Sequence, residues 1–231
     1  MCSSDLLSRL HTERLKAARQ AFVDVVEFVA GNVGERSTAD ALMEAAQGQF
    51  GSVDIVVNNA GVVRDRMLFN MSDEDWDLVL EVHLRGHFLL CRNAAAYWRA
   101  KSKEAGAPVY GRIVNTSSMN YTGGGRPGAT HYVAAKASIA GFTRVLAKEV
   151  GPDGITVNAI APGYVATELI DGFSSPMLAV IREQNPTRRL CEPNEIGALV
   201  AYLASRQAGF INGEIVCIDG GRREFYWGNT A

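Results

Sequence analysis

A tyrosine and a lysine stand four positions apart at Tyr132 and Lys136, in the segment Tyr-Val-Ala-Ala-Lys. Residues i and i+4 lie on one face of an α-helix, so a helix here would hold the phenol and the ammonium about one turn apart. A free phenol has a pKa of about 10, and a nearby cation favours the phenolate and lowers that pKa. The pair could therefore act as a general acid and base, although the same spacing is also common on solvated helix faces.

Three apolar, strand-like segments end in small polar residues and could position such a pair. They span residues 53–58, 112–116 and 155–160. Parallel α/β sheets bind ligands just beyond the carboxyl ends of their strands, so we expect a site where these segments end. The first segment ends in Asn58 and is followed by Asn59, Ala60 and Gly61. The second is followed by Ser117 and Ser118, and the third by Pro162, Gly163, Val165 and Thr167.

Taken in this order, the four motifs resemble the short-chain dehydrogenase/reductase family. The matching patterns are NNAG, a strand followed by two serines, YxxxK, and the loop PG-x-x-x-T. The resemblance extends from about Val25 to Gly221. It implies an NAD(P)-dependent oxidoreductase that interconverts a secondary alcohol and a ketone, with NAD or NADP as cofactor and a small-molecule substrate.

The resemblance also implies a role for each motif. Tyr132 would transfer the proton, and Lys136 would lower the pKa of Tyr132 and hold the nicotinamide ribose. Ser118 would hydrogen-bond the substrate oxygen, with Ser117 as the rival serine. Asn32 and Val33 would meet the adenine. The expected cofactor-binding residues are Asn32, Val33, Asn59, Ala60, Gly61, Tyr132, Lys136, Pro162, Gly163, Val165 and Thr167. No metal site is expected, because no cysteines have metal-type spacing.

His83 departs from the family pattern, which more often has asparagine in a proton relay at this place. Histidine can donate or accept through either ring nitrogen and normally changes charge between pH 5 and 8, so a catalytic His83 would titrate there. A structural helix histidine is the alternative. His11, His87 and His131 are expected to be solvated or to have packing roles.

The surroundings of His83 also bear on the substrate. The patterns Arg64-Asp65-Arg66 and His83-Leu84-Arg85-Gly86 resemble the 3-hydroxyacyl-CoA dehydrogenase part of multifunctional enzymes. The leading substrate is therefore a 3-hydroxyacyl or 3-oxoacyl thioester. A steroid or other cyclic ketone is the alternative.

The chain is expected to form an α/β, doubly wound parallel sheet (Rossmann-like) with right-handed crossovers, as one domain over residues 1–231. Expected strands span residues 25–30, 53–58, 112–116, 155–160 and 214–218. Expected helices span residues 37–50, 72–105, 130–150 and 193–205, with Ser37 or Thr38 and Ser72 as N-caps. Residues 163–190 are expected to form a substrate-covering loop with a short helix, and residues 6–22 have helical spacing.

The usual glycine-rich phosphate turn of such folds is not found before Val25. We therefore expect an N-terminally incomplete fold that binds nicotinamide cofactor poorly, and a catalytically silent truncated fragment is a second hypothesis. NAD and NADP are not distinguished, because the end of the missing second strand normally decides between them.

Composition excludes several other classes. The chain has 231 residues, 47% of them hydrophobic, and a net charge of −2, which suits one globular domain and gives no nucleic-acid footprint. The apolar runs are too short for a membrane span, and no secretory signal is expected. The scattered cysteines indicate free thiols and a cytoplasmic location. A homo-oligomer, dimer or tetramer, is expected.

Overall fold

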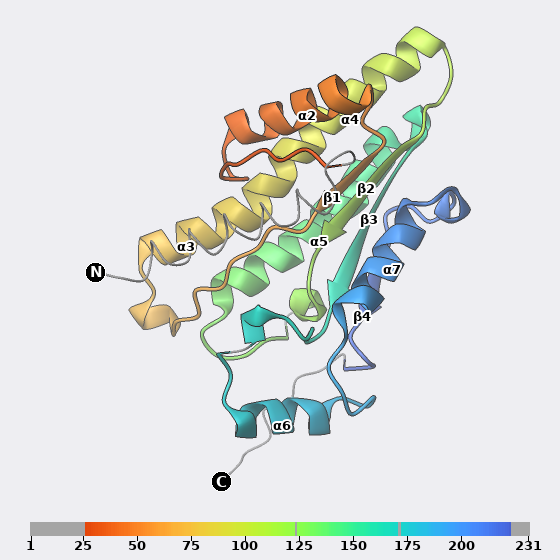
Figure 1. Cartoon of the computed structure of the whole chain (residues 1–231). Helices are drawn as coiled ribbons and strands as arrows, with labels where there is room; N and C mark the ends of the chain where they lie inside the picture. The colour runs from red at the N-terminus through yellow and green to blue at the C-terminus, as the bar shows by residue number, and fades with distance from the viewer. Residues whose placement is uncertain (1–25, 123, 171, 223–231) are drawn as a thin grey trace.

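The computed structural model describes residues 26–122, 124–170 and 172–222. Four strands form one parallel sheet in the order β1-β2-β3-β4 (Figure 1). The strands are β1 (Ile55–Asn58), β2 (Gly111–Thr116), β3 (Ile155–Pro162) and β4 (Ile215–Ile218). The α-helices are α2 (Arg36–Phe50), α3 (Asp73–Leu80), α4 (Gly86–Ala105), α5 (Thr130–Val150), α6 (Ser175–Gln184) and α7 (Pro193–Ala204). The expected Rossmann-like α/β class is confirmed.

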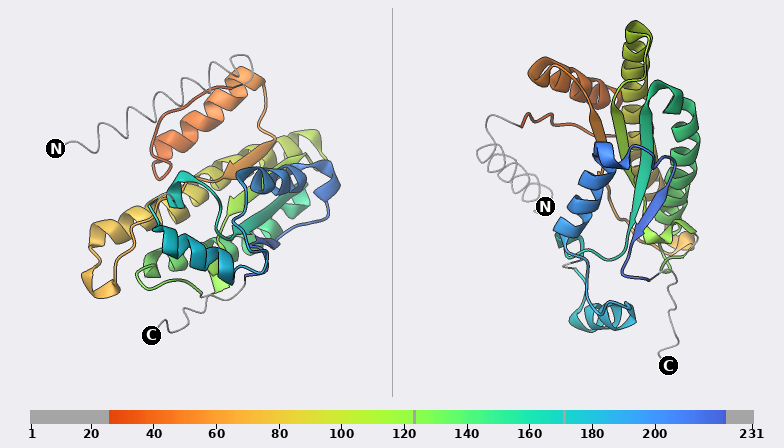
Figure 2. Two further views of the ribbon diagram at one scale, coloured as in Figure 1. Left: turned by 60° about the horizontal axis from the view of Figure 1, so that its bottom comes forward. Right: turned by 90° about the vertical axis from the view of Figure 1, so that its right-hand side faces the viewer.

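Helices cover both faces of the sheet because the strands are apolar at nearly every position. Along β3, Val157 and Ala159 are buried on the side of α4 and α5, whereas Ile160 is buried with Leu203 under α7. Side chains alternate between the faces of a strand, so a continuous apolar run requires cover on both faces. Figure 2 shows this sandwich end-on, with α7 on one side and α5 on the other.

The last crossover has the opposite hand to the first two. The connections from β1 to β2 through α4 and from β2 to β3 through α5 cross the same face of the sheet. The connection from β3 to β4 through α7 crosses the opposite face, although β4 continues the strand order in the same direction, and this reverses the hand. The expectation of uniformly right-handed crossovers is therefore wrong. The right-hand preference acts on a strand that feeds directly into its crossover helix. Here the long segment 163–192 first carries the chain beyond the carboxyl ends of the strands.

The segment expected as the first strand does not form one. Residues 26–30 have no regular secondary structure and are half-buried or exposed, and Val25 lies outside the described residues. A strand needs a hydrogen-bonding neighbour, which an apolar run cannot reveal. Among the described residues β1 forms one edge of the sheet, and Ile55 and Val57 on its α7-facing side are 46% and 43% exposed.

The helix boundaries largely follow the capping signals. Ser72 caps α3, since its hydroxyl accepts a hydrogen bond of 3.1 Å from the Asp75 amide. In contrast, α2 starts one residue before Ser37, and its N-cap Glu35 makes no side-chain cap, so the expected Ser37 or Thr38 cap is wrong. The long helical region expected from residue 72 is confirmed, with a π-helical turn, Glu81–Arg85, joining α3 to α4. The expected helix over residues 6–22 lies outside the described residues.

A buried polar network ties the sheet to the helices on one face. The Asn58 amide donates to Asn115 Oδ1 at 2.9 Å and to Cys91 Sγ at 3.2 Å, and the Asn115 amide donates to Thr143 Oγ1 at 2.9 Å. These side chains come from β1, β2, α4 and α5. Buried amides are stable only when paired, so the network fixes how β1 and β2 are positioned relative to the helices.

Candidate active site

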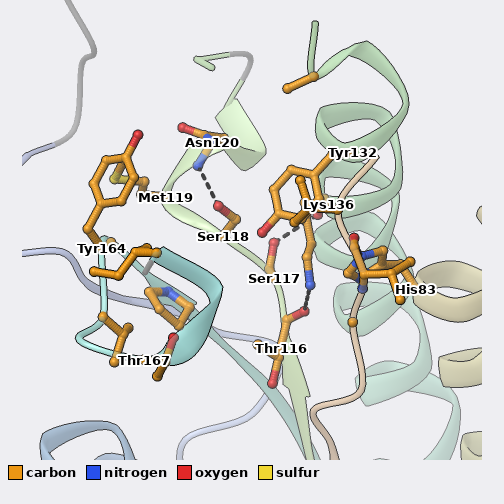
Figure 3. A pocket seen from close by; sticks show the side chains of 18 of the residues that line it. His83, Thr116, Ser117, Ser118, Met119, Asn120, Tyr132, Lys136, Tyr164 and Thr167 are labelled. Carbon is orange, nitrogen blue, oxygen red and sulfur yellow. Dashed lines mark hydrogen bonds between the residues drawn. The ribbon is translucent and has the colours of Figure 1, made fainter. Parts of the chain in front are cut away.

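A cavity of about 480 Å³ opens at the carboxyl ends of the strands. Figure 3 shows Ser118, Tyr132, Lys136 and His83 on one side of it, with Tyr164 on the opposite side. The three polar strand ends of the sequence therefore meet in one place, as expected for a parallel sheet.

Helix α5 places Tyr132 and Lys136 on the face that points into the cavity. The Lys136 Nζ donates to the Thr116 carbonyl oxygen at 2.7 Å and lies 5.5 Å from the centroid of the Tyr132 ring. Lys136 is 3% exposed. A buried ammonium with one carbonyl partner is strongly desolvated, which favours its neutral form.

The protonation of this pair differs from the sequence-based expectation. Burial lowers the pKa of Lys136 to about 7. Burial raises the pKa of the Tyr132 phenol, and a hydrogen bond with Ser118 partly opposes that rise. Lys136 is not among the groups that lower the pKa of Tyr132, because the ammonium is directed to Thr116 and is itself only partly protonated near neutral pH. In this arrangement Ser118, rather than Lys136, favours the phenolate.

The two serines have different environments. Ser117 donates its hydroxyl to the Lys136 carbonyl oxygen at 2.8 Å and so fastens the end of β2 to α5. The Ser118 hydroxyl accepts a 3.3 Å hydrogen bond from the backbone N–H of Asn120 and is also hydrogen-bonded to Tyr132. Of the two hydroxyls, that of Ser118 is better placed to meet a substrate oxygen beside the phenol (Figure 3).

His83 lies in the π-helical turn and packs edge-on against Tyr132, with 5.3 Å between the ring centroids. Its Nε2 is 2.8 Å from the Val62 carbonyl oxygen, and its buried Nδ1 has no hydrogen-bond partner among the described residues. Burial and the Lys136 charge lower the pKa of His83 to about 4. The expectation that His83 changes charge between pH 5 and 8 is therefore wrong, since the ring is neutral across that range.

Two further histidines are buried beside the site and have packing roles rather than solvated ones. His87 accepts a 3.4 Å hydrogen bond from the Thr116 amide, and burial lowers its pKa to about 3. His131 accepts from the Tyr132 amide at 2.9 Å, and its Nε2 is 3.0 Å from the Arg64 carbonyl oxygen. His131 thus joins the start of α5 to the segment that follows β1. His11 lies outside the described residues.

Most of the expected cofactor residues line the cavity. These are Asn59, Gly61, Tyr132, Lys136, Pro162, Gly163, Val165 and Thr167. Val33, Asn59 and Ala60 line a smaller neighbouring cavity of about 110 Å³. Asn32 lines neither cavity, because its side chain accepts from the Gly34 amide and donates to Glu81. A Cβ at Gly61 would lie 2.7 Å from His83 Cε1, so glycine is required there.

These residues fit the nicotinamide half of NAD or NADP. The end of β1 at Asn59 and Gly61 is exposed and carries small groups, which lets a ligand approach the backbone. The buried Lys136 has no carboxylate partner among the described residues and could donate to ribose hydroxyls. The described residues before β1 contain no glycine-rich turn that leads from a strand into a helix, which is the usual pyrophosphate site.

Several cavity residues were not singled out as site candidates from the sequence. They are Asp65, Asn120, Arg126, Tyr164 and Phe173. One signal could have found Arg126: it is a lone charged residue in the glycine-rich stretch between Ser118 and Tyr132, where the chain has one residue more than the family usually has. Asp65 belongs to the Arg64-Asp65-Arg66 pattern, which indicated a substrate class but no site role for Asp65. The other three residues carry no local signal, and only the folded chain brings them to the site.

A parallel Rossmann-like sheet that gathers a serine, a tyrosine and a lysine at its strand ends is the arrangement of a dinucleotide-dependent oxidoreductase. The comparison with protein families identifies the group within that class. Residues 3–223 match the family model described as enoyl-(acyl carrier protein) reductase. The chain belongs to the short-chain dehydrogenase/reductase family, and the resemblance inferred from its motifs is confirmed.

Individual relatives agree with this assignment. The chain is 47% identical over 193 residues to hydroxyacyl-CoA dehydrogenase ChsB1 of Mycobacterium tuberculosis. This alignment covers 83% of this chain and 59% of ChsB1. It is 39% identical over 190 residues to the 3-oxoacyl-[acyl-carrier-protein] reductase FabG of Haemophilus influenzae. This alignment covers 82% of this chain and 75% of FabG. A putative gluconate dehydrogenase from Agrobacterium tumefaciens has a similar structure, with a TM-score of 0.81 and 29% identity over 92% of this chain and 83% of that one.

Among the described residues, no helix combines the length and the apolar character that crossing a membrane requires. No group of three or more histidine, cysteine, aspartate or glutamate side chains there could hold a metal ion.

Proposed function

We propose that the chain is an NAD(P)-dependent oxidoreductase that interconverts a 3-hydroxyacyl and a 3-oxoacyl thioester. The observation that carries the proposal is the convergence of Ser118, Tyr132 and Lys136 in one cavity. The names of ChsB1 and FabG, a hydroxyacyl-CoA dehydrogenase and a 3-oxoacyl-[acyl-carrier-protein] reductase, support the acyl substrate class. The chain spans 59% of the length of ChsB1, so the substrate is inferred from residues that both proteins share.

The proposed proton transfer follows from the geometry. A nicotinamide cofactor, when bound, would supply or accept the hydride at the substrate carbon. The Ser118 hydroxyl would hydrogen-bond the substrate oxygen, and the Tyr132 phenol would donate a proton to that oxygen in reduction and accept it in oxidation. The hydrogen bond from Ser118 would also stabilise the Tyr132 phenolate left after reduction, because a hydrogen bond to the charged form favours that form.

The direct test is a spectrophotometric assay with a 3-oxoacyl thioester. NADH and NADPH should each be supplied at millimolar concentration, so that weak cofactor binding does not conceal turnover. We expect loss of absorbance with at least one of them. A cyclic ketone in a parallel assay tests the steroid-type alternative, and turnover of the cyclic ketone alone would contradict the acyl proposal.

We further propose that His83 passes protons between Lys136 and the substrate side of the cavity through its unpartnered Nδ1. Replacing His83 with Phe is expected to lower kcat about tenfold or more, whereas His83→Asn, which keeps a donor and an acceptor, should stay within a few fold. Neither variant should move the pH–rate profile between pH 5 and 8, because the pKa of His83 is about 4. Full activity of His83→Phe, with an unchanged melting temperature, would assign His83 a structural role.

The cofactor is proposed to be NAD or NADP, bound weakly by this chain. Hydrogen bonds to charged groups contribute roughly 1.5–3 kcal/mol each, and the described part of the chain contains no glycine-rich turn of the kind that usually donates them to the pyrophosphate. Isothermal titration of the 231-residue chain with NADH and with NADPH should give dissociation constants in the millimolar range or weaker. Micromolar binding of either cofactor would show that another segment holds the pyrophosphate.

The remaining assignments are also proposals. We infer that the chain acts as one domain in the cytoplasm, where the cysteines Cys91 and Cys191 would stay reduced. We infer a homo-oligomer, dimer or tetramer, supported by the exposed apolar side chains Phe88 on α4 and Val145 on α5.

The exposed side chains of Ile55 and Val57 on the edge strand β1 favour the second candidate function, a subunit that is catalytically silent until it joins a related chain. Light scattering of the purified protein tests the assembly.

A further inference from the structure

Two side chains of opposite charge line the cavity, and the proposed chemistry does not use them. Asp65 comes from the segment after β1, and Arg126 comes from the glycine-rich stretch before α5. Among the described lining residues the third charged side chain is Lys136, which is directed to Thr116. Asp65 and Arg126 form an ion pair, so their charges cancel within the cavity wall.

The ion pair is held in place by neighbouring contacts. The Arg126 guanidinium lies 5.0 Å from the centroid of the Phe173 ring, which belongs to the segment that covers the cavity. The Arg66 amide donates to the Gly128 carbonyl oxygen at 3.0 Å, joining the same two segments that carry the pair. The side chains of Asp65 and Arg126 are 20% and 26% exposed, so most of the ion pair is shielded from solvent.

The Arg126 guanidinium keeps donors for a ligand. A guanidinium has five N–H groups in a fixed fork. Apart from the ion pair with Asp65, Arg126 makes no hydrogen bond to another described residue. Because Asp65 neutralises its charge, the fork suits an uncharged acceptor such as a carbonyl oxygen. A carboxylate in the same place would lose its hydration and also meet the Asp65 carboxylate.

We propose that the Asp65–Arg126 pair is a specificity determinant that binds the second, uncharged carbonyl oxygen of the substrate. The site would then accept 3-oxoacyl thioesters and esters and discriminate against the free 3-oxo acids. In such a substrate the second carbonyl lies two carbons from the reacting one. Asp65 and Arg126 line the same cavity as Ser118 and Tyr132, where the reacting oxygen would bind. This inference rests on the proposed function, because it assigns the substrate class of the same site.

The test compares three ligands: a 3-oxobutanoyl thioester, 3-oxobutanoate, and 2-pentanone, which has no second carbonyl. Binding is measured without cofactor by ligand-observed NMR, and kcat/KM is measured separately with cofactor. Asp65→Asn should strengthen 3-oxobutanoate binding about tenfold, equivalent to roughly 1.4 kcal/mol, because Arg126 becomes an uncompensated cation. Arg126→Gln should weaken thioester binding by a similar factor and leave 2-pentanone unaffected, and Arg126→Lys should recover part of the loss.

A matched control lies close by in the sequence. Asp75→Asn removes the Arg66–Asp75 pair, 3.2 Å apart and away from the cavity, and should change none of the three affinities. Equal changes for acid and thioester in Asp65→Asn, or the same change in Asp75→Asn, would overturn the inference. If the NMR preferences change as expected but the wild-type chain turns over no 3-oxoacyl thioester, the proposed function fails, and only the ligand preference that the Asp65–Arg126 pair confers on the cavity is supported.

Discussion

Tyr132→Phe is expected to lower kcat roughly 10²–10⁴-fold, the usual effect of removing a general acid or base. The substitution removes one hydroxyl from a half-buried ring and leaves the edge-on contact with His83 in place. KM should change little, because the Ser118 hydroxyl still meets the substrate oxygen. The measurement is steady-state reduction of a 3-oxoacyl thioester at saturating substrate, with circular dichroism to establish that the variant is folded.

Tyr121→Phe is the matched control for this prediction. Tyr121 is partly buried beside Ala159 and Ala161 in the same region but does not line the cavity. We expect the kcat of this variant to stay within about twofold of wild type, because removing a hydroxyl outside the cavity should change neither stability nor catalysis much. A Tyr132→Phe variant that also stayed within twofold would remove Tyr132 from the proposed proton transfer.

Lys136→Met is expected to abolish most activity while making the folded protein more stable at or below neutral pH. The Lys136 ammonium is buried, and its pKa falls from 10.5 to about 7. One pKa unit corresponds to about 1.4 kcal/mol, so burying the charge opposes folding by roughly 5 kcal/mol at most. Loss of the Nζ bond to Thr116 offsets about 1 kcal/mol of the gain. A net gain of about 2–4 kcal/mol in the free energy of unfolding remains.

The sign of the pH dependence follows from which state binds the proton more tightly. Between pH 7 and 10.5 the unfolded chain keeps the Lys136 proton and the folded chain has released it. Wild-type stability therefore rises with pH in this range, and below pH 7 the penalty is complete and constant. The advantage of Lys136→Met should shrink by about 2–3 kcal/mol between pH 6 and pH 9.

Urea unfolding at pH 6, 7.5 and 9 measures this change, with Lys148→Met as control. Lys148 is exposed on the same helix, α5, so its substitution should shift stability by less than about 0.5 kcal/mol at each pH. A Lys136→Met protein that is less stable than wild type at pH 6 would show that the ammonium is well solvated in the folded state.

Local patterns were enough to place the backbone of the site. The helix over Thr130–Val150 agrees with its expected bounds at both ends, because its apolar face repeats with helical spacing and glycines flank it. All four strands of the sheet and the Ser72 cap were also foreseen, because runs of apolar, β-branched residues and helix-capping residues are local signals that act within a few positions. The strand expected over residues 25–30 failed for the opposite reason: a strand depends on a neighbour that its own residues do not specify.

The sequence alone indicated the fold class and the family, because both follow from the order of local motifs and of alternating strands and helices along the chain. It also proposed Tyr132 and Lys136 as the proton-transfer pair from their spacing on one helix. The tertiary structure decided what each group can do. It directed Ser117 to the Lys136 carbonyl and left Ser118 beside the phenol. It also buried Lys136 and His83 enough to lower their pKa values to about 7 and about 4. Desolvation and ion pairing, such as that of Asp65 with Arg126, arise between segments far apart in the chain, and no local pattern encodes them.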